Sequence, residues 1–275
     1  MSLTPTKLKE LCTKYGLTPS KAYGQNYLIS DAPIKKMVEA ATVGPGDTII
    51  EVGPGFGVLT FALVEKAKKV IAFEIEKKLS RYWDEQQEKY PNLNIVWGNV
   101  LKEFATHSAL FPKTYKVVAN LPYHITSNLL RTVLEAEHKP EKVVVMVQKE
   151  VAERIVAKPG DMSLLSVSVQ YYGVPKIITK VPKGSFWPQP KVDSAVLSID
   201  IYQKETVTDD AFFRIVKAGF SNKRKQLWRN LAEGLHLDKE YVQHILIDLV
   251  GSETVRAQEL SVDDWKKIVR ELGSS

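Results

Sequence analysis

Five short apolar runs separated by helix-like stretches occupy residues 47–150, and they constrain the fold more than any other feature. The runs read "TIIEV", "VIAFEI", "NIVWG", "KVVANL" and "KVVVMVQ". Continuous apolar runs of this length are typical of strands buried on both faces, and the intervals leave room for a crossover helix after most of them. The pattern therefore predicts a doubly wound α/β sheet.

A second pattern follows this region. The runs "LLSVSVQYYG", "PKIITKV" and "SAVLSIDIY", from residue 164 onward, alternate apolar and polar residues more strictly and are separated by links rich in Pro and Gly. We expect them to be antiparallel strands that close the far side of the sheet. After residue 205 the chain is helix-patterned, with Asp209 or Asp210 suited to an N-cap. We therefore predict a sheet domain at residues 1–205 and a small all-helical domain at residues 206–275.

Composition excludes several classes of protein. Hydrophobic residues make up 44% of the 275 residues and charged residues 25%, as in an ordinary globular protein. The N-terminus lacks the apolar run of a signal peptide, and no stretch reaches the roughly 18 to 20 apolar residues of a membrane span. A single cysteine, Cys12, suits a reducing compartment. We expect a cytoplasmic protein with no membrane partner and no metal site.

Positive charge is concentrated near the C-terminus. The net charge of +6 favours a polyanionic partner, and the segment "AFFRIVKAGFSNKRKQLWRNLA" contains no acidic residue. A solvated helix face is the alternative explanation. We expect one basic helix whose apolar side is formed by Phe212, Ile215, Val216, Phe220, Leu227 and Leu231. The candidate contacts to the phosphates of such a partner are Arg214, Lys217, Lys223, Arg224, Lys225 and Arg229.

A glycine-rich loop follows the first predicted strand. The stretch "IIEVGPGFGVLTFAL" places Gly53, Gly55 and Gly57 before a helix, where glycines let the backbone approach a ligand and tolerate positive φ. Glu74 ends the second strand, where nucleotide-binding sheets place a carboxylate for ribose hydroxyls. Either feature alone has a purely structural explanation. Together they favour a cofactor that contains adenosine.

Two classes of cofactor fit such a site. A dinucleotide usually requires the spacing G-x-G-x-x-G, whereas this loop has G-x-G-x-G. S-adenosylmethionine has no phosphate but carries an amino-acid end, and a carboxylate just before the loop, such as Glu51, suits its ammonium group. The sequence therefore favours S-adenosylmethionine.

The stretch "VANLPYHITSNLL" places Asn120, Leu121, Pro122 and Tyr123 at the end of the fourth strand. The Asn120 side-chain oxygen and the Leu121 carbonyl both accept hydrogen bonds, and Pro122 stiffens the turn. Two convergent acceptors suit an exocyclic amino group, which they orient towards a methyl donor while Tyr123 stacks on the base. A simple turn is the alternative. The position beside the cofactor loop favours catalysis.

Seven blocks, in order along nearly the whole chain, resemble the ribosomal RNA adenine dimethyltransferases, the KsgA family of small-subunit enzymes. They are "YGQNYLIS", "IIEVGPGFGVLT", "FEIEKKL", "VANLPYHITSNLL", "VQKEVAERI", "FWPQPKVDSAVLSI" and "FSNKRKQLWRNL". The resemblance implies a Rossmann-like class I methyltransferase sheet, mostly parallel with an antiparallel strand at one edge. It also implies N6,N6-dimethylation of two adjacent adenosines near the 3′ end of small-subunit rRNA, on an assembling 30S subunit. We expect the protein to be a monomer.

The resemblance also implies roles for individual residues. Asn120 forms hydrogen bonds to the target adenine and Tyr123 stacks on it, with Phe186 stacking on the second face of the base. Glu74 binds the donor's ribose. The remaining positions implied to contact the donor are Gln25, Asn26, Leu28, Gly53, Gly55, Ile75, Val100 and Asn120.

One position departs from the family pattern. Asn99 stands where the family usually has an Asp that accepts a hydrogen bond from the donor's adenine amine. Asparagine keeps an acceptor oxygen but loses the charge, so we expect weaker cofactor binding.

Two alternatives remain open. One is the related large-subunit rRNA methyltransferase that confers macrolide resistance, and the other is a non-catalytic RNA-binding assembly factor with the same fold. The motifs "NLPY" and "PKVDSAV" favour the small-subunit branch. Intact Gly53, Glu74 and Asn120 argue against a loss of catalysis.

Overall fold

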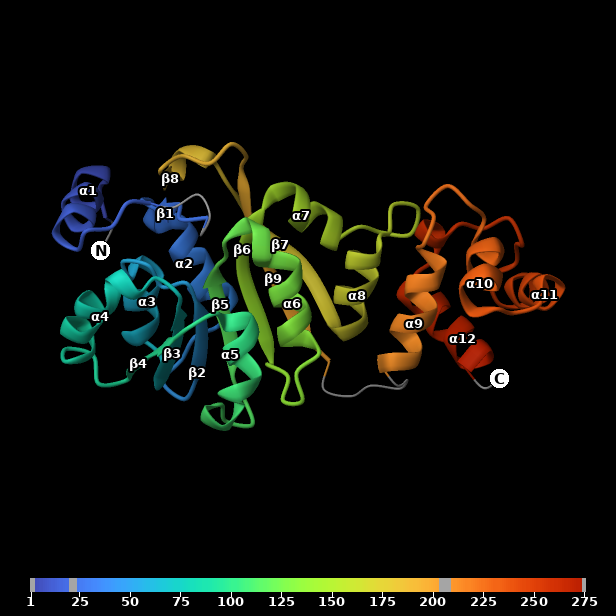
Figure 1. The fold of residues 1–275 in the computed structure, drawn as a ribbon, viewed down its shortest axis with the longest axis horizontal. Helices are drawn as coiled ribbons and strands as arrows, with labels where there is room; N and C mark the ends of the chain where they lie inside the picture. Colours follow the sequence, from blue (N-terminus) through green and yellow to red (C-terminus); the bar gives the residue numbers. More distant parts are fainter. Residues whose placement is uncertain (1–2, 20–23, 203–208, 274–275) are drawn as a thin grey trace. The chain divides into compact units, whose positions relative to one another are not determined.

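The computed structural model describes residues 3–19, 24–202 and 209–273, which form two compact units (Figure 1). The first unit consists of Met1–Ala152 and Pro175–Ile201, and the second of Glu153–Val174 and Tyr202–Ser275. The first holds the sheet and the second is mainly helical.

A seven-stranded sheet with the order β4-β3-β2-β5-β6-β9-β7 forms the centre of the first unit. The strands from β4 to β6 pair in parallel, and β9 pairs antiparallel with β6. All five residues of β2 are buried, as expected of a strand covered on both faces. The predicted Rossmann-like sheet, with an antiparallel strand towards one edge, is confirmed. The bounds are β2 Thr48–Val52, β3 Lys69–Glu74, β4 Leu93–Trp97, β5 Lys116–Asn120, β6 Lys142–Gln148, β7 Gly173–Val181 and β9 Ser194–Ile201.

Helices and a small second sheet complete the first unit. In the view of Figure 1, α5 and α6 lie over the large sheet. The short strand β1 (Tyr27–Leu28) pairs antiparallel with β8 (Phe186–Trp187). The helices are α1 Pro5–Lys14, α2 Asp31–Ala40, α3 Val58–Val64, α4 Ser80–Gln87, α5 Val100–Thr106, α6 Thr126–Leu134 and, ending at the junction with the second unit, α7 Lys149–Ile155.

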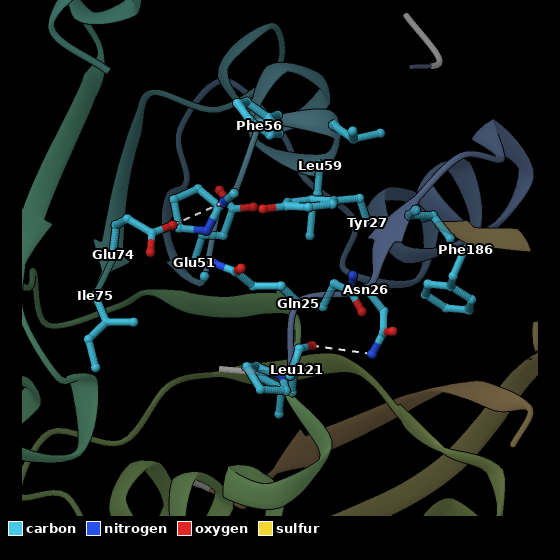
Figure 2. Close-up of a pocket in the computed structure, with 18 of the residues that line it drawn as sticks. Gln25, Asn26, Tyr27, Glu51, Phe56, Leu59, Glu74, Ile75, Leu121 and Phe186 are labelled. Carbon is cyan, nitrogen blue, oxygen red and sulfur yellow. Dashed lines mark hydrogen bonds between the residues drawn. The ribbon is translucent and has the colours of Figure 1, made fainter. Parts of the chain in front are cut away.

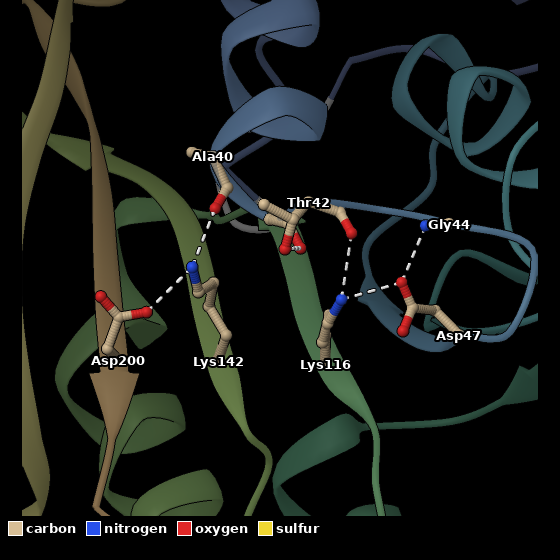
Figure 3. Close-up of polar contacts among 8 residues, drawn as sticks. Ala40, Thr42, Gly44, Asp47, Lys116, Lys142 and Asp200 are labelled. Carbon is tan, nitrogen blue, oxygen red and sulfur yellow. Dashed lines mark hydrogen bonds and ion pairs between the residues drawn. The ribbon is translucent and has the colours of Figure 1, made fainter.

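Two lysines hold the carboxyl end of α2 and the loop after it against the starts of β5 and β6 (Figure 3). Lys116 Nζ lies 2.8 Å from Asp47 Oδ2 and donates to the Thr42 carbonyl at 3.1 Å. Lys142 Nζ donates to the Ala40 carbonyl at 3.3 Å and lies 2.9 Å from Asp200. The last carbonyls of a helix lack partners within the helix and favour cations, so these contacts fix α2 on the sheet. The helix begins three residues after β1, which lines the pocket described below.

The prediction of a strand at residues 164–173 is wrong, because α8 (Leu164–Tyr172) occupies this stretch. Ser163 Oγ accepts from the Ser166 amide at 3.2 Å, and the Ser163 amide donates to Ser166 Oγ at 2.6 Å. This reciprocal pair is a capping box, which satisfies amides that a helix start leaves free. The apolar residues fit both periodicities, and the cap at Ser163 is a local signal for the helical one.

The prediction of a single basic helix around residues 211–232 is also wrong. The segment forms α9 (Asp209–Gly219) and α10 (Leu227–Leu235), separated by an irregular turn. Asn230 Nδ2 donates to the Gly219 carbonyl at 2.7 Å and to the Asn222 carbonyl at 2.9 Å. These bonds satisfy carbonyls at the end of α9, where the chain turns. The predicted apolar side is otherwise confirmed, since all its members are buried except the half-buried Phe220.

The second unit also includes α11 (Lys239–Val250) and α12 (Val262–Gly273). Tyr171 of α8 stacks on Phe212 of α9 with ring centroids 4.0 Å apart. Residues 153–174 therefore group with the C-terminal helices, whereas the domain division predicted at residue 205 places them with the sheet. That division, as a boundary between independently folding domains, stays a prediction. Across the described parts of both units, no helix is long and apolar enough to cross a bilayer.

Candidate active site

A pocket opens at the carboxyl end of the large sheet, where open α/β sheets bind ligands (Figure 2). In this view Phe186 lies on the side opposite Glu74 and Ile75, with Gln25 and Asn26 between them. The pocket brings together thirteen of the predicted residues, although five separate segments supply them. These are Gln25, Asn26, Leu28, Glu51, Gly53, Gly55, Glu74, Ile75, Asn120, Leu121, Pro122, Tyr123 and Phe186.

The other two predicted cofactor residues, Asn99 and Val100, line an adjoining pocket that shares Gly53, Ile75 and Pro122 with the first. Asn99 is the N-cap of α5, and its Oδ1 accepts from the Leu101 amide at 3.0 Å. One lone pair of this oxygen is therefore used within the protein, and a carbonyl oxygen has a second for a ligand.

The glycine loop takes a backbone conformation that few other residues adopt. Gly53 and Gly55 have φ of +69° and +55°. A Cβ atom on Gly55 would lie only 3.0 Å from Cε1 of Tyr27, which closes one wall of the pocket. Glycine is thus required here both for its positive φ and for the close approach of the tyrosine ring.

Glu74 fixes this loop to the end of β3. Its carboxylate is 4% exposed and accepts from the Gly55 amide at 3.1 Å and from the Glu76 amide at 2.7 Å. Burial raises the pKa of Glu74, and the backbone amides partly offset this. A carboxylate has about four acceptor sites, so further hydrogen bonds to ribose hydroxyls are compatible with this geometry.

Glu51 and Tyr27 place polar atoms in the pocket wall without partners among the described residues. Glu51 is 1% exposed, and neither its Oε2 nor the Tyr27 hydroxyl makes a hydrogen bond. Burial raises the pKa of Glu51 to about 8; the neighbouring Thr60 hydroxyl partly offsets this, and the charge of Glu74 adds to the rise. Buried polar groups are almost always hydrogen-bonded, so these two atoms mark a site for a polar or cationic ligand group.

The Asn120–Tyr123 turn lies directly after β5. The Leu121 amide donates to the Met146 carbonyl at 3.1 Å, which holds the turn to the neighbouring strand β6. The Asn120 side chain has no hydrogen bond to the described residues. Burial raises the pKa of Tyr123, whose hydroxyl lies 2.7 Å from Ser194 Oγ. The turn thus presents, beside an anchored ring, a side-chain amide that the described residues leave available for a ligand.

Several pocket residues were not predicted from the sequence. Tyr27 lies between two predicted residues, and its ring packs on Phe56 with centroids 5.2 Å apart. Phe56 lies inside the glycine loop, and Leu59 follows on α3. Tyr27 and Phe56 could have been suspected from the sequence only because they adjoin the predicted residues Asn26 and Gly55. Which side chains face the pocket depends on the tertiary structure. His124 lines the adjoining pocket beside Asn99.

The predicted RNA-contacting cations belong to the second unit. Arg214, Lys217, Lys223, Arg224 and Arg229 are exposed, whereas Lys225 is half-buried and its Nζ lies 2.9 Å from Glu233. Lys225 is therefore the least available to phosphate. Within the described ranges, no group of three or more His, Cys, Asp or Glu side chains is arranged to hold a metal ion.

Comparisons with known proteins show the family of the chain. Residues 17–273 match the family described as ribosomal RNA adenine dimethylase. The chain is 44% identical over 270 residues to ribosomal RNA small subunit methyltransferase A of Dehalococcoides mccartyi, covering 97% of this chain and 93% of that relative.

Solved structures show the same fold. A dimethyladenosine transferase from Plasmodium falciparum superposes with a TM-score of 0.77 at 26% identity, covering 90% of this chain and 97% of that one. The 23S rRNA methyltransferase ErmE superposes with a TM-score of 0.72 at 24% identity, covering 90% and 100%, and shows likeness of fold alone. The methyltransferase fold is thus confirmed, and the chain belongs to the ribosomal RNA adenine dimethylase family.

Proposed function

We propose that this protein transfers methyl groups from S-adenosylmethionine to the N6 amines of two adjacent adenosines near the 3′ end of small-subunit rRNA, two groups on each. The observation that carries the proposal is the convergence of the Asn120–Tyr123 turn with the glycine loop, Glu51 and Glu74 in one pocket. Membership of the family and the 44% identity to a small-subunit methyltransferase support it. The reaction takes place on assembling 30S subunits in the cytoplasm, and the protein acts as a monomer.

The polar groups of the pocket fit this donor. The unpartnered Glu51 Oε2 suits its ammonium group, and the buried Glu74 carboxylate suits its ribose hydroxyls. Asn99 and Val100 line the adjoining space, which suits its adenine. When bound, the donor supplies a methyl group on a positively charged sulfur.

The residues of the turn act on the target adenine. Asn120 Oδ1 and the Leu121 carbonyl accept the two protons of the N6 amine, which orients its lone pair towards the methyl group. Tyr123 and Phe186 stack on the two faces of a base flipped out of its helix. An amine that has gained a methyl group loses its extra proton readily, so the site works through orientation and needs no strong base.

The alternatives receive less support. The likeness to ErmE is one of fold, whereas the relative with 44% identity has a name that specifies the small subunit. A non-catalytic assembly factor has no need of an Asn120 amide that makes no hydrogen bond to the described residues beside a ligand pocket.

The test is transfer of labelled methyl groups to small subunits that lack this modification, followed by mass mapping of the modified nucleotides. We expect two adjacent dimethylated adenosines near the 3′ end. Asn120→Ala is expected to abolish transfer and to retain subunit binding, because the phosphate contacts lie elsewhere. Asn128→Ala, at an exposed position on α6, is the matched control and is expected to retain activity. Normal transfer by Asn120→Ala would refute the mechanism.

A further inference from the structure

The motif "PKVDSAV" (residues 190–196) contributes two residues, Asp193 and Ser194, that do not line the pocket but contact the segments that do. Ser194 begins β9 and pairs with Gln148 at the end of β6. The Asp193 carbonyl accepts from the Lys149 amide at 3.0 Å. Both residues of the dipeptide are therefore fixed to the carboxyl end of β6.

Ser194 contacts the tyrosine of the Asn120–Tyr123 turn. Its Oγ lies 2.7 Å from the Tyr123 hydroxyl, and Ser194 is 0% exposed. A hydroxyl buried without a partner is costly, so each of these groups favours the geometry that keeps the other within reach. The hydroxyl oxygen of a tyrosine lies on the axis of its ring rotation, so an anchor there restricts the first side-chain torsion and fixes the direction in which the Tyr123 ring points.

Asp193 contacts the segment that carries Phe186. Its Oδ1 accepts from the Lys183 amide at 2.9 Å. Lys183 begins the 3₁₀ turn Lys183–Ser185, and Phe186 follows directly. The Ser185 carbonyl accepts from the Ile29 amide at 2.8 Å, and Phe186 pairs with Leu28 across β1 and β8. The start of the turn is thus held by Asp193 and its end by β1.

We propose that Asp193 and Ser194 are positioning residues, which set the two aromatic faces of the base pocket from one rigid point on the sheet. Ser194 acts through the hydroxyl of Tyr123, and Asp193 acts through the backbone that delivers Phe186. The inference rests on the proposed function, in which these two rings hold the target adenine. In this proposal, the "PKVDSAV" motif holds the rings of Tyr123 and Phe186, which are far apart in the sequence, in fixed positions relative to each other.

A double-mutant cycle with Ser194→Ala and Tyr123→Phe tests the first contact. Tyr123→Phe keeps the stacking ring and removes only the hydroxyl. We expect either single change to lower kcat for methyl transfer to undermethylated small subunits by about 3- to 10-fold, the range of one net hydrogen bond. In the Tyr123→Phe background, Ser194→Ala is expected to cost less than about 2-fold, because the contact is already lost.

Ser198→Ala is the matched control, since Ser198 is also a buried serine on β9. It is expected to leave kcat within about 2-fold of the parent value, and all variants are expected to bind S-adenosylhomocysteine like the parent. If Ser194→Ala costs as much in the Tyr123→Phe background as in the parent, Ser194 acts on the fold and the proposal fails. A parent-like kcat in the single Ser194→Ala variant also overturns it.

The Asp193 contact is tested by comparing alanine with asparagine. Asp193→Asn keeps an acceptor oxygen for the Lys183 amide, whereas Asp193→Ala removes it. Because Asp193 is exposed, we expect a loss in kcat of about 2- to 3-fold for alanine and a parent-like value for asparagine. Equal values for the two variants would contradict the assigned role of the side chain.

A measurement without substrate separates this inference from the proposed function. With 3-fluorotyrosine at position 123 only, we expect Ser194→Ala to shift the fluorine resonance and Ser198→Ala to leave it unchanged. If the parent methylates no small subunits but the resonance behaves in this way, the function is wrong and the contact to Tyr123 is correct. If the parent is active and Ser194→Ala leaves the resonance unchanged, the inference is wrong and the function stands.

Discussion

Replacing Glu51 by glutamine tests how the pocket receives a cationic ligand group. The side chain is 1% exposed, and its Oε2 has no partner among the described residues. Burial raises the pKa of Glu51 to about 8. At pH 7 about nine tenths of the molecules without ligand therefore carry this carboxyl in its neutral form. An ammonium group that binds beside it favours the ionised form, so binding of the donor is expected to expel the proton.

The expected number of protons follows from two pKa values. Glu51 has a pKa of about 8 in the pocket, and a free α-amino group has one of about 7.7–8.0. If the complex contains a carboxylate and an ammonium group, binding at pH 7 releases about 0.8 proton. In Glu51→Gln the carboxyl is absent, and binding takes up about 0.1 proton to complete protonation of the ligand's amine.

The assay is calorimetry of S-adenosylhomocysteine binding at pH 7 in buffers with different ionisation enthalpies. This product carries the same amino-acid end as the donor. Parent affinity is expected to fall by about tenfold between pH 7 and pH 6, because the ionised fraction of Glu51 falls by that factor, whereas Glu51→Gln shows no such decline. Glu65→Gln, which removes an exposed carboxylate at the end of α3, is expected to behave like the parent. Equal proton release by the parent and Glu51→Gln would refute the reasoning.

The stability of the protein without ligand provides a second test of the pKa of Glu51. Its trend is opposite, because ligand affinity rises with pH whereas stability falls. The folded-state pKa of Glu51 lies above the value of 4.5 taken for the free side chain, so its neutral form stabilises the fold and ionisation destabilises it. The free energy of unfolding of the parent, relative to Glu51→Gln, is expected to fall as the pH rises from about 4.5 to about 8. Chemical denaturation at several pH values measures this difference.

Three further predictions concern other parts of the chain. Asn99→Asp is expected to tighten donor binding by about 2- to 5-fold through a charged acceptor, and calorimetry showing equal affinity would contradict this. Lys223→Gln combined with Arg224→Gln is expected to reduce the slope of log K against log salt concentration for RNA binding by about 1.4–1.8, without changing donor affinity. Titrations at several salt concentrations measure this slope, and an unchanged slope would exclude phosphate contacts at these two residues. Lys116→Met is expected to lower the free energy of unfolding by about 1–3 kcal/mol, because it leaves the Asp47 carboxylate and the Thr42 carbonyl without this partner. Exposed Lys102→Met is its control in denaturant unfolding, and equal stability of the two variants would contradict the role given to Lys116.

The sequence predicted the central strands well, because strands buried on both faces leave continuous apolar runs that no other element explains as simply. Residues 48–52 and 142–148 were predicted with the bounds that the structure shows. It failed at residues 164–173, where a short alternating apolar run fits both a strand and a helix. It also failed between α9 and α10, where the turn depends on Asn230, a residue eleven positions beyond the carbonyl of Gly219 that it satisfies.

For the candidate site as well, some features could be predicted from the sequence and others depend on the tertiary structure. The sequence by itself determined which chemical groups are present: a glycine loop after a strand, a carboxylate at the end of the next one, and Asn120 with Tyr123 at the end of a third. These are local signals, because the carboxyl ends of neighbouring parallel strands necessarily lie at one edge of the sheet.

Only the tertiary structure decided which side chains face one another and how deeply they are buried. Burial, not proximity in sequence, raises the pKa of Glu51 to about 8, and chain folding brings Ser194 within 2.7 Å of the hydroxyl of Tyr123, 71 residues away. Tyr27 enters the pocket because β1 pairs with β8, a contact between segments separated by almost 160 positions. Desolvation and long-range pairing depend on the complete fold, and no local pattern encodes them.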